Sequence, residues 1–131
     1  MAKTALNDKE ITLLNQKVLA HVATVMADGT PQVTPVWVDT DGEALLFNTA
    51  KGRVKYRNIE RNPKVAISVV ADGDHYNTVV LRGTAQFIDE GADAHIDKLA
   101  KKYLNADSYP FRRDGEQRVI VRVVPESMVR M

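Results

Sequence analysis

The part of the sequence best suited to chemistry is a basic segment between Phe47 and Lys64. Positions 51–64 contain six cations and one acid, Glu60, a local charge of +5 in a chain whose net charge is +1. The cations are Lys51, Arg53, Lys55, Arg57, Arg61 and Lys64. Because the rest of the chain then carries −4, the distribution favours a local anionic ligand over a nucleic-acid surface.

This basic segment combines three devices that bind phosphate: a hydroxyl, free backbone N–H groups and charged donors. Thr49 ends a predicted strand and Gly52 lies in a short loop. A helix follows, with Lys51, Arg53 and Lys55 predicted in its first turn. Cations at a helix N-terminus are destabilising by about 0.3–1 kcal/mol each, and a bound anion would offset that cost. The segment therefore predicts a phosphate site.

A solvated basic helix face is the alternative explanation of the same segment. Arg53, Arg57 and Arg61 recur every four residues, so they would form one stripe that points to water. The spacing alone leaves both explanations open.

A second candidate is the extended segment PQVTPVW. Alternate residues of a strand face opposite sides, so Val33, Pro35 and Trp37 would share one face. An apolar wall with the amide of Gln32 and the hydroxyl of Thr34 nearby would suit a planar heterocycle. The alternative, which the strand spacing by itself favours, is that Trp37 is ordinary core.

Other kinds of chemistry lack the residues that they need. The chain has no cysteine, which excludes disulfides, a thiolate nucleophile and thiolate-ligated metals. His21, His75 and His95 belong to no metal-binding motif, so the sequence predicts no metal site. There is no nucleophile elbow, Walker A loop or G-x-G-x-x-G motif. No catalytic side chain is therefore identified.

The elements that must position these segments are mainly strands. Asn7 and Glu10 form a capping box, which predicts a first helix that ends near Leu19. Asp-Gly pairs at positions 28–29 and 41–42 predict tight hairpin turns and hence a three-stranded meander.

Two prolines limit where the second strand of that meander, predicted over Pro31–Thr40, can lie in the sheet. Pro31 and Pro35 cannot donate to a sheet, so this strand is expected at an edge, at a bulge or beside a ligand. The other predicted elements are a short basic helix over 52–63, strands over 64–72, 77–89 and 117–125, a polar loop over 72–78, and a helix over Asp93–Leu104.

These elements predict one domain over residues 1–131 in a mainly β (α+β) fold. About six strands joined by tight turns, with three helices, are typical of an antiparallel barrel with peripheral helices. A doubly wound parallel sheet would need a helix after nearly every strand. The N-terminus has no apolar signal and no apolar run reaches membrane-spanning length, so we expect a cytoplasmic protein.

Taken together, the motifs resemble a known family. They are the A-T-V-x-x-D-G-x-P hairpin, P-V-W-x-D, K-x-R-x-K-x-R-N-I-x-R-N-P and V-x-L-R-G-T-A. From about Leu6 to Met131 the chain is similar to the pyridoxamine 5′-phosphate oxidase-like split β-barrels of the FMN-binding type. Within them it most resembles the B-type branch of flavin/deazaflavin oxidoreductases, which use the deazaflavin coenzyme F420.

The resemblance implies a homodimer with two cofactor sites at the subunit interface. It implies that the cofactor phosphate and its surroundings are contacted by Asn48, Thr49, Lys51, Arg53 and Lys55. The ring system would lie along Pro35, Val36 and Trp37, and Tyr76 would come from the other subunit.

The activity that the resemblance implies is hydride transfer from reduced coenzyme F420 to a conjugated small-molecule acceptor. The cofactor carries this chemistry, which agrees with the absence of a catalytic constellation. FMN is the alternative cofactor, because its phosphate presents the same anchor. The excess of positive charge favours the deazaflavin, whose polyglutamate tail could bind Arg57 or Arg61.

Two interpretations in which the protein is not an enzyme remain. A non-catalytic carrier or sensor of the cofactor would need the same anchor, and turnover with an acceptor would separate it from an enzyme. A single-stranded nucleic-acid-binding barrel would interleave exposed aromatic residues with the cations, and only Tyr56 lies there.

Overall fold

The first helix forms where its capping box predicts. In the computed structural model, which describes residues 4–130, α1 spans Asp8–Leu14. The side chain of Asn7 accepts a hydrogen bond from the backbone N–H of Glu10 at 2.8 Å, and the Glu10 carboxylate accepts one from the Asn7 N–H at 2.9 Å. Two N–H groups that the helix leaves free are thereby satisfied, as predicted.

The predicted end of this helix near Leu19 is wrong. The helix ends at Leu14, and Asn15 forms its C-cap. Val18 is nonetheless buried, and its carbonyl accepts a hydrogen bond from the Tyr103 hydroxyl. Val18 fits the helical spacing of apolar residues although it lies beyond the helix, because it packs into the core from an irregular segment.

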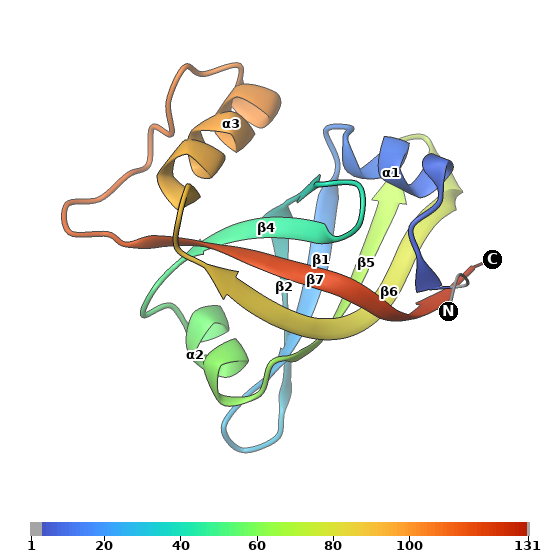
Figure 1. Cartoon of the computed structure of the whole chain (residues 1–131), viewed down its shortest axis with the longest axis horizontal. Coiled ribbons are helices and arrows are strands. Elements are labelled where there is room, and N and C mark those ends of the chain that lie inside the picture. The colour runs from blue at the N-terminus through green and yellow to red at the C-terminus, as the bar shows by residue number, and fades with distance from the viewer. Residues whose placement is uncertain (1–3, 131) are drawn as a thin grey trace.

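Seven strands form one antiparallel sheet (Figure 1). They are β1 Leu19–Val25, β2 Pro31–Trp37, β3 Asp39–Thr40, β4 Leu45–Ala50, β5 Lys64–Ala71, β6 Asp74–Ile88 and β7 Arg118–Val129. Their order is β2-β1-β5-β6-β7-β4-β3, and every neighbouring pair is antiparallel. The predicted mainly β split barrel is confirmed, with seven strands where six were expected.

The additional strand arises because the segment Pro31–Thr40 breaks at Val38. The Val38 N–H donates to the Tyr103 hydroxyl at 3.0 Å, and its carbonyl accepts from Lys102 Nζ at 2.6 Å. Side chains thus replace sheet partners at this residue. β2 pairs with β1 and β3 pairs with β4, so one continuous segment forms both edges of the sheet and brings them together.

β2 lies at an edge of the sheet, as its prolines predict. It pairs only with β1, so neither Pro31 nor Pro35 has to donate a hydrogen bond to a second strand. The predicted alternation also holds in its burial, since Val36 is buried whereas Val33 and Pro35 are exposed.

The polar loop predicted over residues 72–78 is shorter than expected. β5 and β6 are joined by a two-residue turn, Asp72–Gly73, and Ala71 already pairs with Asp74. Gly73 has a φ of +80°, which glycine adopts without strain. Tyr76 therefore lies on β6 and not in a loop.

The remaining helices are α2 Val54–Arg61 and α3 Ala92–Leu104. Figure 1 shows both at one end of the barrel, with the segment that joins α3 to β7 projecting beside them. The buried stripe of α3 contains Ile96, Leu99 and Tyr103, as predicted, and packs against Trp37. No helix within residues 4–130 is long and apolar enough to cross a membrane.

Candidate functional site

The basic segment bends sharply between β4 and α2. β4 ends at Ala50, Gly52 has a φ of +91°, and the Arg53 N–H bonds back to the Ala50 carbonyl at 3.3 Å. Because this turn needs three residues, Arg53 becomes the N-cap of α2 and Lys51 stays in the turn. The prediction that all three cations lie in the first helical turn is therefore wrong, since only Lys55 does.

The N-terminus of α2 has no acceptor of its own. Arg53 provides no side-chain cap, and the first turn contains no acidic residue. The free N–H groups at a helix start are normally satisfied by Ser, Thr, Asp or Asn, and they attract negative charge. This helix thus begins with unpaired donors and two cations, which is an unfavourable arrangement without an anion.

Three cations from different elements gather at this helix start. Arg53 and Lys55 come from α2, and Arg118 comes from the first position of β7. One carboxylate, that of Glu116, pairs with two of them, at 3.1 Å from Arg118 and 3.6 Å from Arg53. These four residues, named here the cradle, carry a formal charge of +2.

Lys55 experiences this excess of charge directly. Burial lowers the pKa of its ammonium group, and the neighbouring charges of Arg53 and Arg118 lower it further. Among residues 4–130 Lys55 has no carboxylate partner. A half-buried ammonium group between two guanidinium groups would be stabilised by any bound anion.

A cavity of about 360 Å³ opens beside the cradle. Its polar wall includes Thr49, a buried residue whose hydroxyl oxygen has no hydrogen-bond partner among residues 4–130. Buried hydroxyl groups are nearly always paired in folded proteins. Within the described part of the chain the hydroxyl of Thr34 is also unpaired and does not line this cavity, so the Thr49 hydroxyl favours an anion site only together with the cations beside it. The donors present fit a phosphate ester.

Another part of the cavity lining is apolar and aromatic. Trp37 stacks on Tyr103 with ring centroids 5.1 Å apart and planes 6° apart, and it meets the edge of Tyr109 at 6.0 Å. Phe111, which is 62% exposed, extends this wall. Trp37 therefore both packs against the α3 cluster and lines the cavity, so the two interpretations of this residue are compatible.

Seven of the nine residues predicted to bind the cofactor line this one cavity. They are Pro35, Val36, Trp37, Asn48, Thr49, Arg53 and Lys55. Lys51 is outside it and forms an ion pair with Asp89 at 2.9 Å. Tyr76 is also outside, 74% exposed, beside a small polar hollow near Asn7.

The sequence interpretation missed part of the cavity. Arg118, Tyr109 and Phe111 all line it. The guanidinium group of Arg118 lies 5.1 Å from the Tyr109 ring centroid, in a cation–π contact. The available signal was an arginine at the start of an apolar strand, where a buried charge requires a partner.

A chain of buried polar contacts connects the cradle to α3. Arg118 Nε donates to Asn48 Oδ1 at 2.8 Å, and Asn48 Nδ2 lies 3.1 Å from His95 Nδ1. His95 Nε2 lies 3.2 Å from Asp39 Oδ2, which also accepts from Lys98 at 3.0 Å. Burial alone would raise the pKa of the Asp39 carboxyl, but these hydrogen bonds outweigh it and hold the pKa well below its usual range.

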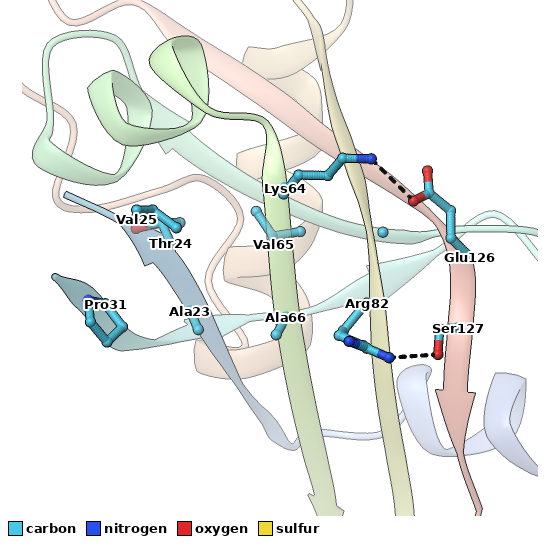
Figure 2. Close-up of a pocket in the computed structure, with 11 residues that line it drawn as sticks. Ala23, Thr24, Val25, Pro31, Lys64, Val65, Ala66, Arg82, Glu126 and Ser127 are labelled. Atoms are coloured by element: carbon cyan, nitrogen blue, oxygen red, sulfur yellow. Dashed lines mark hydrogen bonds and ion pairs between the residues drawn. The ribbon is translucent and has the colours of Figure 1, made fainter. Parts of the chain in front are cut away.

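A larger hollow, of about 460 Å³, lies on the outer face of the sheet, and its charged side chains already have hydrogen-bond partners. Figure 2 shows Lys64 facing Glu126 and Arg82 facing Ser127, at 3.5 Å and 3.2 Å. The small side chains of Ala23 and Ala66 make its floor shallow. The described residues 4–130 also contain no cluster of His, Asp and Glu arranged to bind a metal.

Comparison with known proteins relates the chain to one family. The family described as pyridoxamine 5′-phosphate oxidase matches residues 6–129. Over 91 residues the chain is 35% identical to a reductase of 5a,11a-dehydrotetracycline and 5a,11a-dehydrooxytetracycline from Streptomyces rimosus. That match covers 63% of this chain and 64% of the relative.

Solved structures share the same fold. A protein described as an F420 reductase is 33% identical, with a TM-score of 0.81 over 96% of this chain and all of its own. A conserved hypothetical protein from Mycobacterium tuberculosis is 24% identical, with a TM-score of 0.69 over 98% of this chain and 86% of its own. At that identity the second likeness concerns the fold alone.

Proposed function

The chain belongs to the pyridoxamine 5′-phosphate oxidase family, and we propose that within it the protein is a coenzyme F420-dependent oxidoreductase. The observation that carries this proposal is the cradle. Its net charge of +2 lies at an uncapped helix start and beside the unpaired Thr49 hydroxyl. This arrangement is suited to a phosphate ester, and the likeness to an F420 reductase favours a deazaflavin.

The chain's own residues would bind and orient the cofactor. Arg53, Lys55 and Arg118 would neutralise the phosphate, while the Thr49 hydroxyl and the free N–H groups of α2 would donate to it. Trp37 and Tyr109 would exclude water from the ring. When bound, the deazaflavin supplies a hydride, which the proposed conjugated acceptor takes up. No residue of the cavity is assigned as a proton donor.

The choice of deazaflavin over FMN depends on the outer face of α2. Arg61 is engaged there with the Val25 carbonyl and with Asn58. Arg57 is exposed and lies one turn after Arg53. A polyglutamate tail that leaves the cavity past Arg53 would meet Arg57, whereas FMN has no such tail. We therefore assign the tail contact to Arg57 rather than Arg61.

We also propose that the protein is a homodimer. The outer sheet face carries small side chains and charged side chains that have partners within the chain (Figure 2). Val33 and Val129, which line a neighbouring hollow, are more than half exposed. A flat surface of this kind suits a second copy of the chain. Tyr76, which is far from its own cradle, would then be available to the partner's site. We place the dimer in the cytoplasm, where a cysteine-free chain needs no oxidising compartment.

The test is a parallel titration of the purified protein with coenzyme F420 and FMN, followed by the fluorescence of Trp37, the only tryptophan. We expect both to quench it, because Trp37 lines the cavity, and the deazaflavin to bind more tightly. Arg57→Ala should weaken binding of coenzyme F420 and leave FMN unaffected. Tighter binding of FMN would make the protein a flavin enzyme instead.

Turnover distinguishes an enzyme from a carrier. Reduced coenzyme F420 should be oxidised on addition of planar conjugated acceptors, with the tetracycline-type substrate of the Streptomyces relative as the first choice. Tight binding without oxidation across such a panel would favour a carrier or sensor. Failure to bind either cofactor would reject the proposal.

A further inference from the structure

Within the cradle, the orientation of the Arg118 guanidinium group depends on the side chains around it. Arg118 has a long side chain and five N–H donors. Its Nε donates to Asn48 and its Nη1 to Glu116 at 3.1 Å, while Nη2 has no hydrogen bond to any of residues 4–130. The free donors of this guanidinium group can therefore reach a ligand only while the other two bonds hold the group in place.

The orientation of the Asn48 amide is determined by its neighbours. Arg118 Nε can only donate, so it must face the Asn48 oxygen at 2.8 Å. The Ala92 carbonyl can only accept, so it must face the Asn48 nitrogen at 2.9 Å. These two contacts exclude the flipped amide.

The ring of His95 is fixed in turn. Its Nδ1 lies 3.1 Å from the Asn48 nitrogen, which is a donor, so Nδ1 must accept. The ring hydrogen then lies on Nε2 and donates to Asp39. Lys98 and His95 hold that carboxylate, and Lys102 lies on the same helix. Arg118, Asn48, His95 and Asp39 are all buried, so water cannot readily substitute for a lost partner among them.

We propose that Asn48 and His95 are positioning residues for the phosphate site, which act by directing Arg118 toward the ligand, while Asp39 fixes which nitrogen of His95 carries the hydrogen. The proposal rests on the function proposed above, because it concerns the same phosphate. It assigns to Asn48 a role through Arg118 rather than a contact with the cofactor. It also gives a function to the buried histidine, for which the sequence suggested none.

Two substitutions at position 95 separate positioning from packing. His95→Asn keeps an acceptor where Nδ1 stands and loses the contact with Asp39. His95→Gln keeps a donor where Nε2 stands and loses the acceptor for Asn48. Lys101→Ala, an exposed change on the same helix, is the control.

The first readout needs no cofactor. In the protein labelled with ¹⁵N at histidine and arginine, NMR at neutral pH should show the His95 hydrogen on Nε2 and slow exchange of the Arg118 Nε–H with water. His95→Gln should accelerate that exchange about tenfold, while His95→Asn and Lys101→Ala should not. A hydrogen on Nδ1, or equal exchange in both variants at position 95, would overturn the proposal.

The second readout is the dissociation constant of FMN and of coenzyme F420. His95→Gln should weaken both about tenfold, the equivalent of one lost hydrogen bond, and His95→Asn should stay close to the parent protein. If both variants lose affinity equally, in proportion to their loss of thermal stability, these contacts only pack the core and do not position Arg118. If the parent protein binds neither cofactor, the proposed function fails, while the NMR result still decides whether Arg118 is positioned.

Discussion

Two hollows of this molecule differ in how their charged groups are partnered. In the cradle, Arg53, Lys55 and Arg118 face one carboxylate, and the Thr49 hydroxyl is unpaired. On the outer sheet face each charged group of the hollow has a partner within the chain. The cradle therefore has cations and donors to spare for the anion of the proposed function, whereas the sheet face suits the proposed contact with a second copy. The comparison teaches that the choice of the proposed ligand site rests on unpaired donors and not on volume.

The largest effect should follow from removing both α2 cations of the cradle. The double variant Arg53→Ala/Lys55→Ala should weaken binding of FMN and coenzyme F420 by about 3 kcal/mol or more, because two charge-assisted hydrogen bonds are lost. Its stability should not fall, since the change relieves repulsion among like charges. Isothermal titration calorimetry and thermal unfolding measure the two quantities.

The matched control for that double variant is Lys64→Ala/Arg82→Ala on the sheet face. It removes the same charge and breaks the contacts with Glu126, Thr84 and Ser127. Because this face is also the proposed dimer surface, affinity is compared at a protein concentration where the variant is dimeric, and it should be retained there. Equal losses from both double variants would mean that binding responds to overall charge, and the distinction between the two hollows would be lost.

A second effect concerns stability within the cradle. Arg118→Leu should lower the free energy of unfolding by about 3–5 kcal/mol, because it leaves the buried carboxylate of Glu116 with only a distant partner. Their side chains are 3% and 7% exposed. Adding Glu116→Gln should restore much of the stability but none of the affinity for the cofactor. Recovery of both on chemical denaturation and titration would contradict a ligand-binding role for Arg118.

A third effect tests the sheet face as a surface for a second copy. Ala66→Glu places a carboxylate on its shallow floor and should cost about 2–3 kcal/mol of association, enough to shift a dimer toward monomer at micromolar concentration. Analytical ultracentrifugation measures the shift. Lys101→Glu, at an exposed position of α3, should leave the oligomeric state unchanged. An unchanged mass in both variants would remove this face from the proposal.

The smallest effect is a pH dependence of cofactor binding. The pKa of Lys55 is lowered from 10.5 by burial and by Arg53 and Arg118. A bound phosphate would raise it again, so binding should take up a proton and the affinity should fall as pH rises through the alkaline range below 10.5. Calorimetry in buffers of different ionisation enthalpy detects that proton, and Lys55→Met should abolish the uptake.

Local patterns in the sequence were sufficient for most of the architecture. The capping box and the edge prolines each depend on a few adjacent residues, and both appear in the structure as predicted. The Asp-Gly pairs do lie between paired strands, but in the longer loops 26–30 and 41–44. The predicted three-stranded meander is wrong, because β2 and β3 lie at opposite edges of the sheet. The basic segment was located for the same reason, because six cations within fourteen positions form a local signal. Where local spacing misled, as at Val18 and Val38, contacts from the distant Tyr103 had replaced helix or sheet partners.

The composition of the site, by contrast, depends on tertiary structure. Arg118 and Tyr109 are more than fifty residues from Lys55 in the sequence, and only the pairing of β4 with β7 brings Arg118 to the start of α2. Lys51 lies outside the cavity and pairs with Asp89, which directly follows β6. Residue types and short spacings determine which elements form and where charge accumulates. Which of those charges remain unpaired is decided by the partners that the folded barrel places beside them.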